Sequence, residues 1–184
     1  AAYDVRPDLK HYIAAIKRTV YANYKGMYHA PNEILPYPFI TPGSVYSQDL
    51  WDWDSWLSSI ALRQILTDVG TRQDVQEALP HEKGCVLDFL KYGGRDGWLP
   101  IVVWHNANPR DTIPEDIHST NMHKPVLAQH AAFIVGSEGG DASWLRGEFW
   151  KMEAFIENYK TYSRNEATGL FFFKDDVAIG GEND

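Results

Sequence analysis

The chain has 184 residues, of which 44% are hydrophobic and 14% aromatic, and its formal net charge is −8. This length favours one domain with a substantial core. The acidic balance argues against nucleic acid or an anionic membrane surface as a partner, because both require a basic footprint. Cys85 is the single cysteine, so it cannot form an internal disulfide, and we interpret it as a small buried hydrophobe. No apolar run reaches the roughly 18 residues that a membrane span needs, and the compartment stays open.

Apolar side chains recur at helical spacing in five segments, which we predict as amphipathic helices. These segments cover about residues 8–25, 52–70, 72–92, 124–136 and 141–162. Asp52 or Asp54 can cap the second helix. We expect Pro80 to interrupt the third. Pro125 is placed in the first turn of the fourth, where a missing N–H costs little.

Two long irregular segments, residues 27–48 and 93–122, separate these helices. Long segments of this kind inside a compact domain are often functional. Both follow odd-numbered helices, and consecutive helices are expected to be antiparallel neighbours, so both segments should lie at the same end of the array. Short β-like runs are predicted at residues 98–104 and 170–173.

The stretch from residue 49 to residue 57 concentrates three Trp and three Asp. Carboxylates are rarely buried without a partner, so this run fits poorly as plain core. It fits the floor of a sugar pocket, in which an indole covers the apolar C–H face of a pyranose and a carboxylate accepts hydrogen bonds from two hydroxyls. The alternative is a helix cap with aromatic core residues behind it.

Four local patterns follow one another along residues 50–184. They are Trp53-Asp54-Ser55, Gly97-Trp98-Leu99-Pro100, His123-Lys124-Pro125-Val126-Leu127, and Thr168-Gly169-Leu170 followed by Gly181-Glu182-Asn183. The set resembles the (α/α)6-barrel glycoside hydrolases, closest to glycoside hydrolase family 63 (the processing α-glucosidase I type and its bacterial relatives) and next to the trehalases. Two positions depart from the family pattern: Glu182 stands where Asp is usual, and His123 where Gln is usual.

The resemblance implies an all-α fold, the six-hairpin (α/α)6 toroid, with long loops and short β segments at one end. Residues 1–184 would supply its N-terminal half, about the first five helices, and the remaining half would come from a second chain or a missing segment. The implied activity is that of an inverting α-glycosidase acting on glucose- or mannose-containing disaccharides or oligosaccharides.

The resemblance also implies roles for particular residues. Glu182 matches the general acid, with Asp184 as a like-charge neighbour or an alternative acid. Inverting hydrolysis needs a second carboxylate roughly 6.5–9.5 Å away as general base, and the resemblance places that base outside this chain. An acid that acts near neutral pH requires a raised pKa, which burial or a nearby like charge can supply.

Trp53 and Asp54 match the residues that bind the non-reducing sugar, although the motif could slip by two positions to Trp51-Asp52. Trp98 would either line the pocket or pack in the core. Further predicted substrate-binding residues precede or begin the fourth helix: His123, Lys124 and Gln129. The first two could donate hydrogen bonds to sugar hydroxyls.

No resident cofactor is expected, and no metal ligands are assigned, because the histidines and the cysteine lack zinc-type spacing. Asp111, Glu115 and Asp116 could supply oxygen ligands to a structural Ca²⁺, but they lack EF-hand spacing. Two alternative functions remain. One is a sugar epimerase on the same barrel, which would use a His pair for proton transfer. The other is a non-catalytic carbohydrate-binding module.

Overall fold

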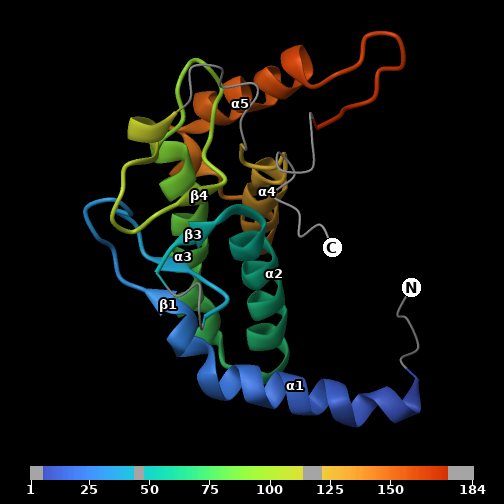
Figure 1. Ribbon diagram of the computed structural model, residues 1–184. Coiled ribbons are helices and arrows are strands. Elements are labelled where there is room, and N and C mark those ends of the chain that lie inside the picture. The colour runs from blue at the N-terminus through green and yellow to red at the C-terminus, as the bar shows by residue number, and fades with distance from the viewer. Residues whose placement is uncertain (1–5, 44–47, 114–121, 174–184) are drawn as a thin grey trace.

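The computed structural model describes residues 6–43, 48–113 and 122–173, and these residues are mostly helical (Figure 1). Its five α-helices are α1 (Lys10–Asn23), α2 (Asp52–Val69), α3 (Arg72–Lys91), α4 (Leu127–Ser137) and α5 (Phe149–Tyr162). Short 3-10 helices cover Pro7–Leu9, Tyr24–Met27, Pro109–Thr112 and Ser143–Leu145. The predicted all-α class is therefore confirmed for the described part of the chain.

Helices α2 and α3 form an antiparallel hairpin, and α1 runs across its base (Figure 1). The turn between α2 and α3 is short, because a capping box at Thr71 starts α3. The Thr71 hydroxyl accepts from Asp74 N at 3.2 Å, and Asp74 Oδ2 accepts from Thr71 N at 2.7 Å. The predicted interruption at Pro80 is wrong, since α3 continues through it. Pro80 removes one N–H, but the fully buried Ala78 and Glu82 on either side hold the helix in place.

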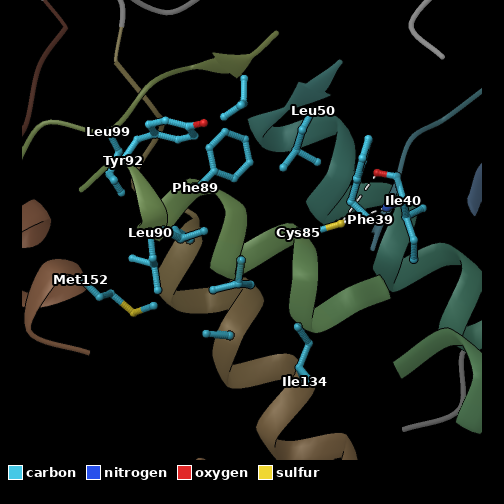
Figure 2. Close-up of a cluster of buried hydrophobic side chains, with 14 of the residues drawn as sticks. Phe39, Ile40, Leu50, Cys85, Phe89, Leu90, Tyr92, Leu99, Ile134 and Met152 are labelled. Atoms are coloured by element: carbon cyan, nitrogen blue, oxygen red, sulfur yellow. Dashed lines mark hydrogen bonds between the residues drawn. The ribbon is translucent and has the colours of Figure 1, made fainter. Parts of the chain in front are cut away.

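Helix α3 supplies the centre of the hydrophobic core (Figure 2). Its buried Cys85, Phe89 and Leu90 pack with side chains from β2, α4 and α5. The Cys85 sulfur accepts a hydrogen bond from Ile40 N at 3.2 Å, and burial raises the pKa of the thiol to about 12. The interpretation of Cys85 as a small buried residue is therefore confirmed.

Two short antiparallel sheets are built from the long irregular segments and from the residues directly before α2. Strand β1 (Tyr28–His29) pairs with β2 (Phe39–Ile40), and β3 (Leu50–Trp51) pairs with β4 (Val102–Val103). The predicted β-like run at 98–104 thus forms a strand over two residues only, and the run at 170–173 forms a single bridge between Arg164 and Phe171. The second sheet places the segment after α3 against the start of α2.

Both long segments reach the C-terminal end of α3, where Tyr92 contacts both, but the first also runs along the helix, since Tyr28 stacks on His81 near its middle. Its hydroxyl donates to Ile34 O at 2.7 Å, and its carbonyl accepts from Arg110 Nε at 2.6 Å. Gly84 lets the first segment approach α3 closely, because a Cβ at this position would lie 1.8 Å from Pro38 O. This end of the helical array therefore gathers irregular chain from two regions.

A buried ion cluster joins the middle of α2 and α3 to the C-terminal end of α4. Arg63 of α2 donates through Nε to Glu82 Oε1 of α3 at 2.9 Å and through Nη2 to Glu82 Oε2. Its Nη1 lies 3.2 Å from Oε1 of Glu138, the residue that follows α4. Arg63 and Glu82 are both buried, so the planar guanidinium fixes the relative positions of these helices.

Helix α1 differs from the others because none of its residues is buried. Tyr12 and Ile16, two apolar residues of this helix, are each 60% exposed.

Among the helices that the structure describes, none combines the length and the apolar character needed to cross a membrane.

Candidate functional site

The site begins at Asp52, the first residue of α2. Its backbone N donates to Ile101 O at 3.0 Å, and its Oδ2 accepts from Lys124 N at 2.9 Å. The carboxylate is 1% exposed and lies in the first turn of α2, where the positive end of the helix dipole stabilises it. Asp52 therefore joins two segments that are distant in the sequence.

This contact also explains where α4 begins. We predicted a start at Lys124-Pro125, but the helix starts at Leu127. Because Lys124 N donates to Asp52 and His123 N donates to Leu99 O at 2.9 Å, these residues are held in a non-helical connection. Pro125 consequently precedes the helix, and the prediction that places it in the first turn is wrong.

The Lys124 side chain lies between Asp52 and Trp53. Its Nζ is 3.4 Å from Asp52 Oδ2 and 5.2 Å from the centroid of the Trp53 ring. Burial lowers the pKa of Lys124, and the Asp52 carboxylate opposes this shift by favouring the charged form. The ammonium thus contacts one face of an indole that is itself 39% exposed.

His123 is buried between Phe89 and Phe155, whose rings meet it edge-on at 4.5 and 5.7 Å. Its Nδ1 is 2.6 Å from Lys124 O. A carbonyl can only accept, so Nδ1 carries the proton and Nε2 is the free acceptor. Burial lowers the pKa of His123, whereas the negative charge of Asp52 acts in the opposite direction. Its backbone O accepts from the Tyr159 hydroxyl at 2.8 Å, which anchors the segment to α5.

Three side-chain atoms at this junction are buried without a hydrogen-bond partner in the part of the chain that the structure describes. They are Asp52 Oδ1, Lys124 Nζ and His123 Nε2. The Nζ has an ion-pair contact with Oδ2 but not the alignment of a hydrogen bond. Buried polar atoms are seldom left unpaired, and a cluster of them requires an explanation in terms of a ligand, an ordered water or a functional role.

The other predicted substrate-binding residues lie in different environments. Asp54 is partly buried in the first turn of α2. Its negative charge opposes, to a small extent, the lowering of the Lys124 pKa by burial. Trp98 is buried, and its ring lies 5.2 Å from the Arg110 guanidinium, which favours the core-packing alternative. Gln129 is exposed on the first turn of α4. Of the predicted substrate-binding residues, the structure places Lys124 against Trp53, whereas the His123 ring is buried between Phe89 and Phe155.

Both predicted acids, Glu182 and Asp184, lie outside the described residues, as do Glu115 and Asp116. Asp111 lies in the 3-10 helix Pro109–Thr112. Within residues 6–43, 48–113 and 122–173, no group of three or more His, Cys, Asp or Glu side chains is arranged to hold a metal ion.

Asp52 is the residue that the sequence interpretation underrated. Helical spacing distinguishes Asp52 from Asp54. The buried Ser55, Ser59 and Leu62 follow Asp52 by three, seven and ten positions, so they share one face of α2 with it. Asp54 does not fall on that face. The two carboxylates therefore have separate surroundings, with Asp52 turned into the protein and Asp54 closer to solvent.

This arrangement offers an indole surface, an ammonium group and two carboxylates at one helix end. Such a set can bind a neutral ring that has an apolar face and several hydroxyls, because the indole covers the ring and the polar groups fix its orientation. The chain has no match among protein-family models, curated proteins or solved structures. The interpretation of the site consequently depends on its own residues and geometry.

Proposed function

We propose that this chain is the sugar-binding half of an inverting α-glycosidase that acts on glucose- or mannose-containing disaccharides or oligosaccharides. Two of the four segments that resemble the (α/α)6-barrel glycoside hydrolases hydrogen-bond to each other, and Asp52, the residue directly before the Trp53-Asp54-Ser55 segment, hydrogen-bonds to one of them. Leu99 O accepts from His123 N at 2.9 Å, and Asp52 Oδ2 accepts from Lys124 N at 2.9 Å. These contacts bring segments that are distant in the sequence to the start of α2. This is the observation that supports the proposal.

In this proposal the Trp53 indole stacks on the sugar at the non-reducing end. Asp54 accepts hydrogen bonds from its hydroxyls, and the buried Lys124 packs against the indole from within the protein. Asp52 does not contact the sugar, because it is buried; it holds Lys124 beside the indole. Glu182 protonates the leaving oxygen, and the general base is outside this chain.

We also propose that the helices belong to an (α/α)6 toroid completed by another segment or chain. Apolar surface supports this idea. An open groove of about 350 Å³ is lined by Pro125, Ile156, Tyr159, Lys160 and Phe171–Phe173, and α1 presents Tyr12 and Ile16 to solvent. Exposed apolar surfaces of this kind often mark an interface. Light scattering should show self-association of the chain, which Phe171→Ser weakens. A stable monomer that binds no hydrophobic dye would contradict the toroid.

Sugar binding is tested by calorimetric titration of the chain with maltose and with α-1,2-mannobiose. We expect Trp53→Ala to weaken binding by about tenfold or more, because it removes the stacking surface. Trp150→Ala is the matched control, since Trp150 is 45% exposed and Lys151 Nζ lies 5.7 Å from its ring. If the two variants weaken binding equally, or if neither sugar binds, the proposed site is wrong.

The chemistry is tested in a protein that also carries the general base. Glu182→Gln should abolish release of reducing sugar while binding persists, and Asp184→Asn should retain it. An epimerase would keep its turnover in Glu182→Gln and would change the sugar without hydrolysis. Binding without any turnover in the unmodified protein would indicate a carbohydrate-binding module.

A further inference from the structure

A second exposed indole lies close to the proposed site. Trp104 follows β4 directly and is 43% exposed. Its ring meets the Trp51 ring edge-on, with the centroids 5.5 Å apart and an interplanar angle of 80°. Trp51 is two residues before Trp53, so their Cα atoms are at most about 7 Å apart. Trp51 therefore connects the Trp104 ring to the start of α2.

The β3–β4 sheet fixes this arrangement, because Trp51 pairs with Val102 and Leu50 with Val103 (Figure 1). The chain after Trp104 is held as well. Asp49 Oδ1 accepts from His105 N at 2.9 Å and lies 2.8 Å from His105 Nδ1. Backbone pairing on one side and a carboxylate contact on the other thus hold Trp104 in place before any ligand binds, which reduces the entropic cost of binding.

The surroundings of Trp104 are polar, unlike those of the apolar groove beside α5. The side chains of Asp49 and His105 remain 19% and 40% exposed, so hydrogen-bonding groups flank the indole. An exposed aromatic surface with a few polar groups beside it suits a saccharide ring. The groove at Phe171–Phe173, in contrast, is lined almost entirely by apolar side chains and suits a protein surface.

We propose that Trp104, with Asp49 and His105, forms a second saccharide subsite that continues from Trp53. The preferred ligand is then an oligosaccharide longer than a disaccharide, with one sugar on Trp53 and a later unit on Trp104. This inference rests on the proposed function, because it extends the ligand that Trp53 binds.

The test compares short and long ligands of the same series: maltose with maltotetraose, and α-1,2-mannobiose with α-1,2-mannotetraose. In the unmodified chain, the tetrasaccharide of the recognised series should bind about tenfold more tightly than its disaccharide. Trp104→Ala should remove this gain and leave the affinity for the disaccharide unchanged. Trp104→Phe should keep part of the gain, and Trp150→Ala should affect neither ligand.

Equal affinities for the disaccharide and the tetrasaccharide in the unmodified chain would overturn the second subsite and leave Trp53 as the binding residue. Equal weakening of both ligands by Trp104→Ala, with an unchanged melting temperature, would also overturn it. If Trp104→Ala fails to fold, Trp104→Phe and the comparison of ligand lengths in the unmodified chain still test the second subsite. If no saccharide binds the unmodified chain, the proposed function is overturned together with the subsite.

Discussion

Among the described residues, two buried ion pairs connect α2 to other parts of the fold, and they differ in how completely their polar atoms are paired. In the pair between α2 and α3, Arg63 contacts both oxygens of Glu82 and also reaches Glu138. At the start of α2, the Asp52–Lys124 pair leaves Asp52 Oδ1 and Lys124 Nζ without a hydrogen-bond partner among the described residues. A fully paired ion cluster fixes helix positions, whereas an incompletely paired one retains bonding capacity for a ligand.

The largest expected effect follows from breaking the complete pair. Glu82→Gln leaves the buried Arg63 charge largely uncompensated, and we expect the free energy of unfolding to fall by about 3–5 kcal/mol. Urea denaturation measures this loss. Glu138→Gln is the control, because the Glu138 side chain is 27% exposed, and it should cost about 1 kcal/mol or less. Equal losses of unfolding free energy in Glu82→Gln and Glu138→Gln would show that Glu82 does not compensate the Arg63 charge more than Glu138 does.

A third buried carboxyl, Asp88, sharpens the comparison because it belongs to no ion pair in the part of the chain that the structure describes. Its Oδ1 accepts from Tyr37 N at 3.1 Å, and burial raises its pKa to about 8. The folded protein therefore keeps Asp88 protonated at pH values where the unfolded chain, with a pKa near 3.9, is ionised. The stability from this group is complete below about pH 4 and is lost as the pH rises to about 8.

Asp88→Asn imitates the protonated acid and should remove this pH dependence. Relative to the unmodified protein, we expect the variant to become progressively more stable as the pH rises from roughly 4 to 8. Melting temperatures measured at pH 5 and pH 8 provide the test. Asp111→Asn, which alters an exposed carboxyl, should leave the slope unchanged. Parallel pH profiles for Asp88→Asn and the unmodified protein would contradict the raised pKa.

The smallest effect is expected at the incompletely paired junction. Asp52→Asn keeps an oxygen for the bond from Lys124 N, and it removes a charge that opposes the lowering of the Lys124 pKa by burial. We expect a loss of about 1 kcal/mol in the free energy of unfolding. Asp52→Ala also removes the acceptor and should cost more. If Asp52→Asn destabilises the protein as much as Glu82→Gln does, the distinction between the two pairs is wrong.

Local signals were sufficient for much of the helical framework. Helical spacing placed the limits of α2 and α3 within one residue of those observed. The predicted cap of α2 at Asp52 or Asp54 is wrong, because Trp51 occupies the cap position and no side chain hydrogen-bonds there. The interruption predicted at Pro80 failed because burial on both sides of a proline outweighs the loss of one hydrogen bond. This burial depends on neighbouring helices and cannot be read from a local pattern.

The site itself depended on contacts between distant residues. The start of α4 was misplaced because Lys124 N donates to Asp52, which lies 72 positions earlier. The pairing of Trp51 with Val102 is equally non-local, and two-residue strands carry too weak a pattern to be assigned in advance. The composition of residues 49–57 predicted a sugar site there, but the helical spacing that separates Asp52 from Asp54 was not used to decide which carboxylate faces inward.

The bond between Asp52 and position 124 has an evolutionary consequence. It goes to the main-chain N–H of Lys124, which every residue except proline provides. Almost any side chain could therefore replace the lysine without disconnecting α2 from the segment that precedes α4. Related proteins can change the chemical group presented beside Trp53 at this single position while the scaffold beneath it stays the same.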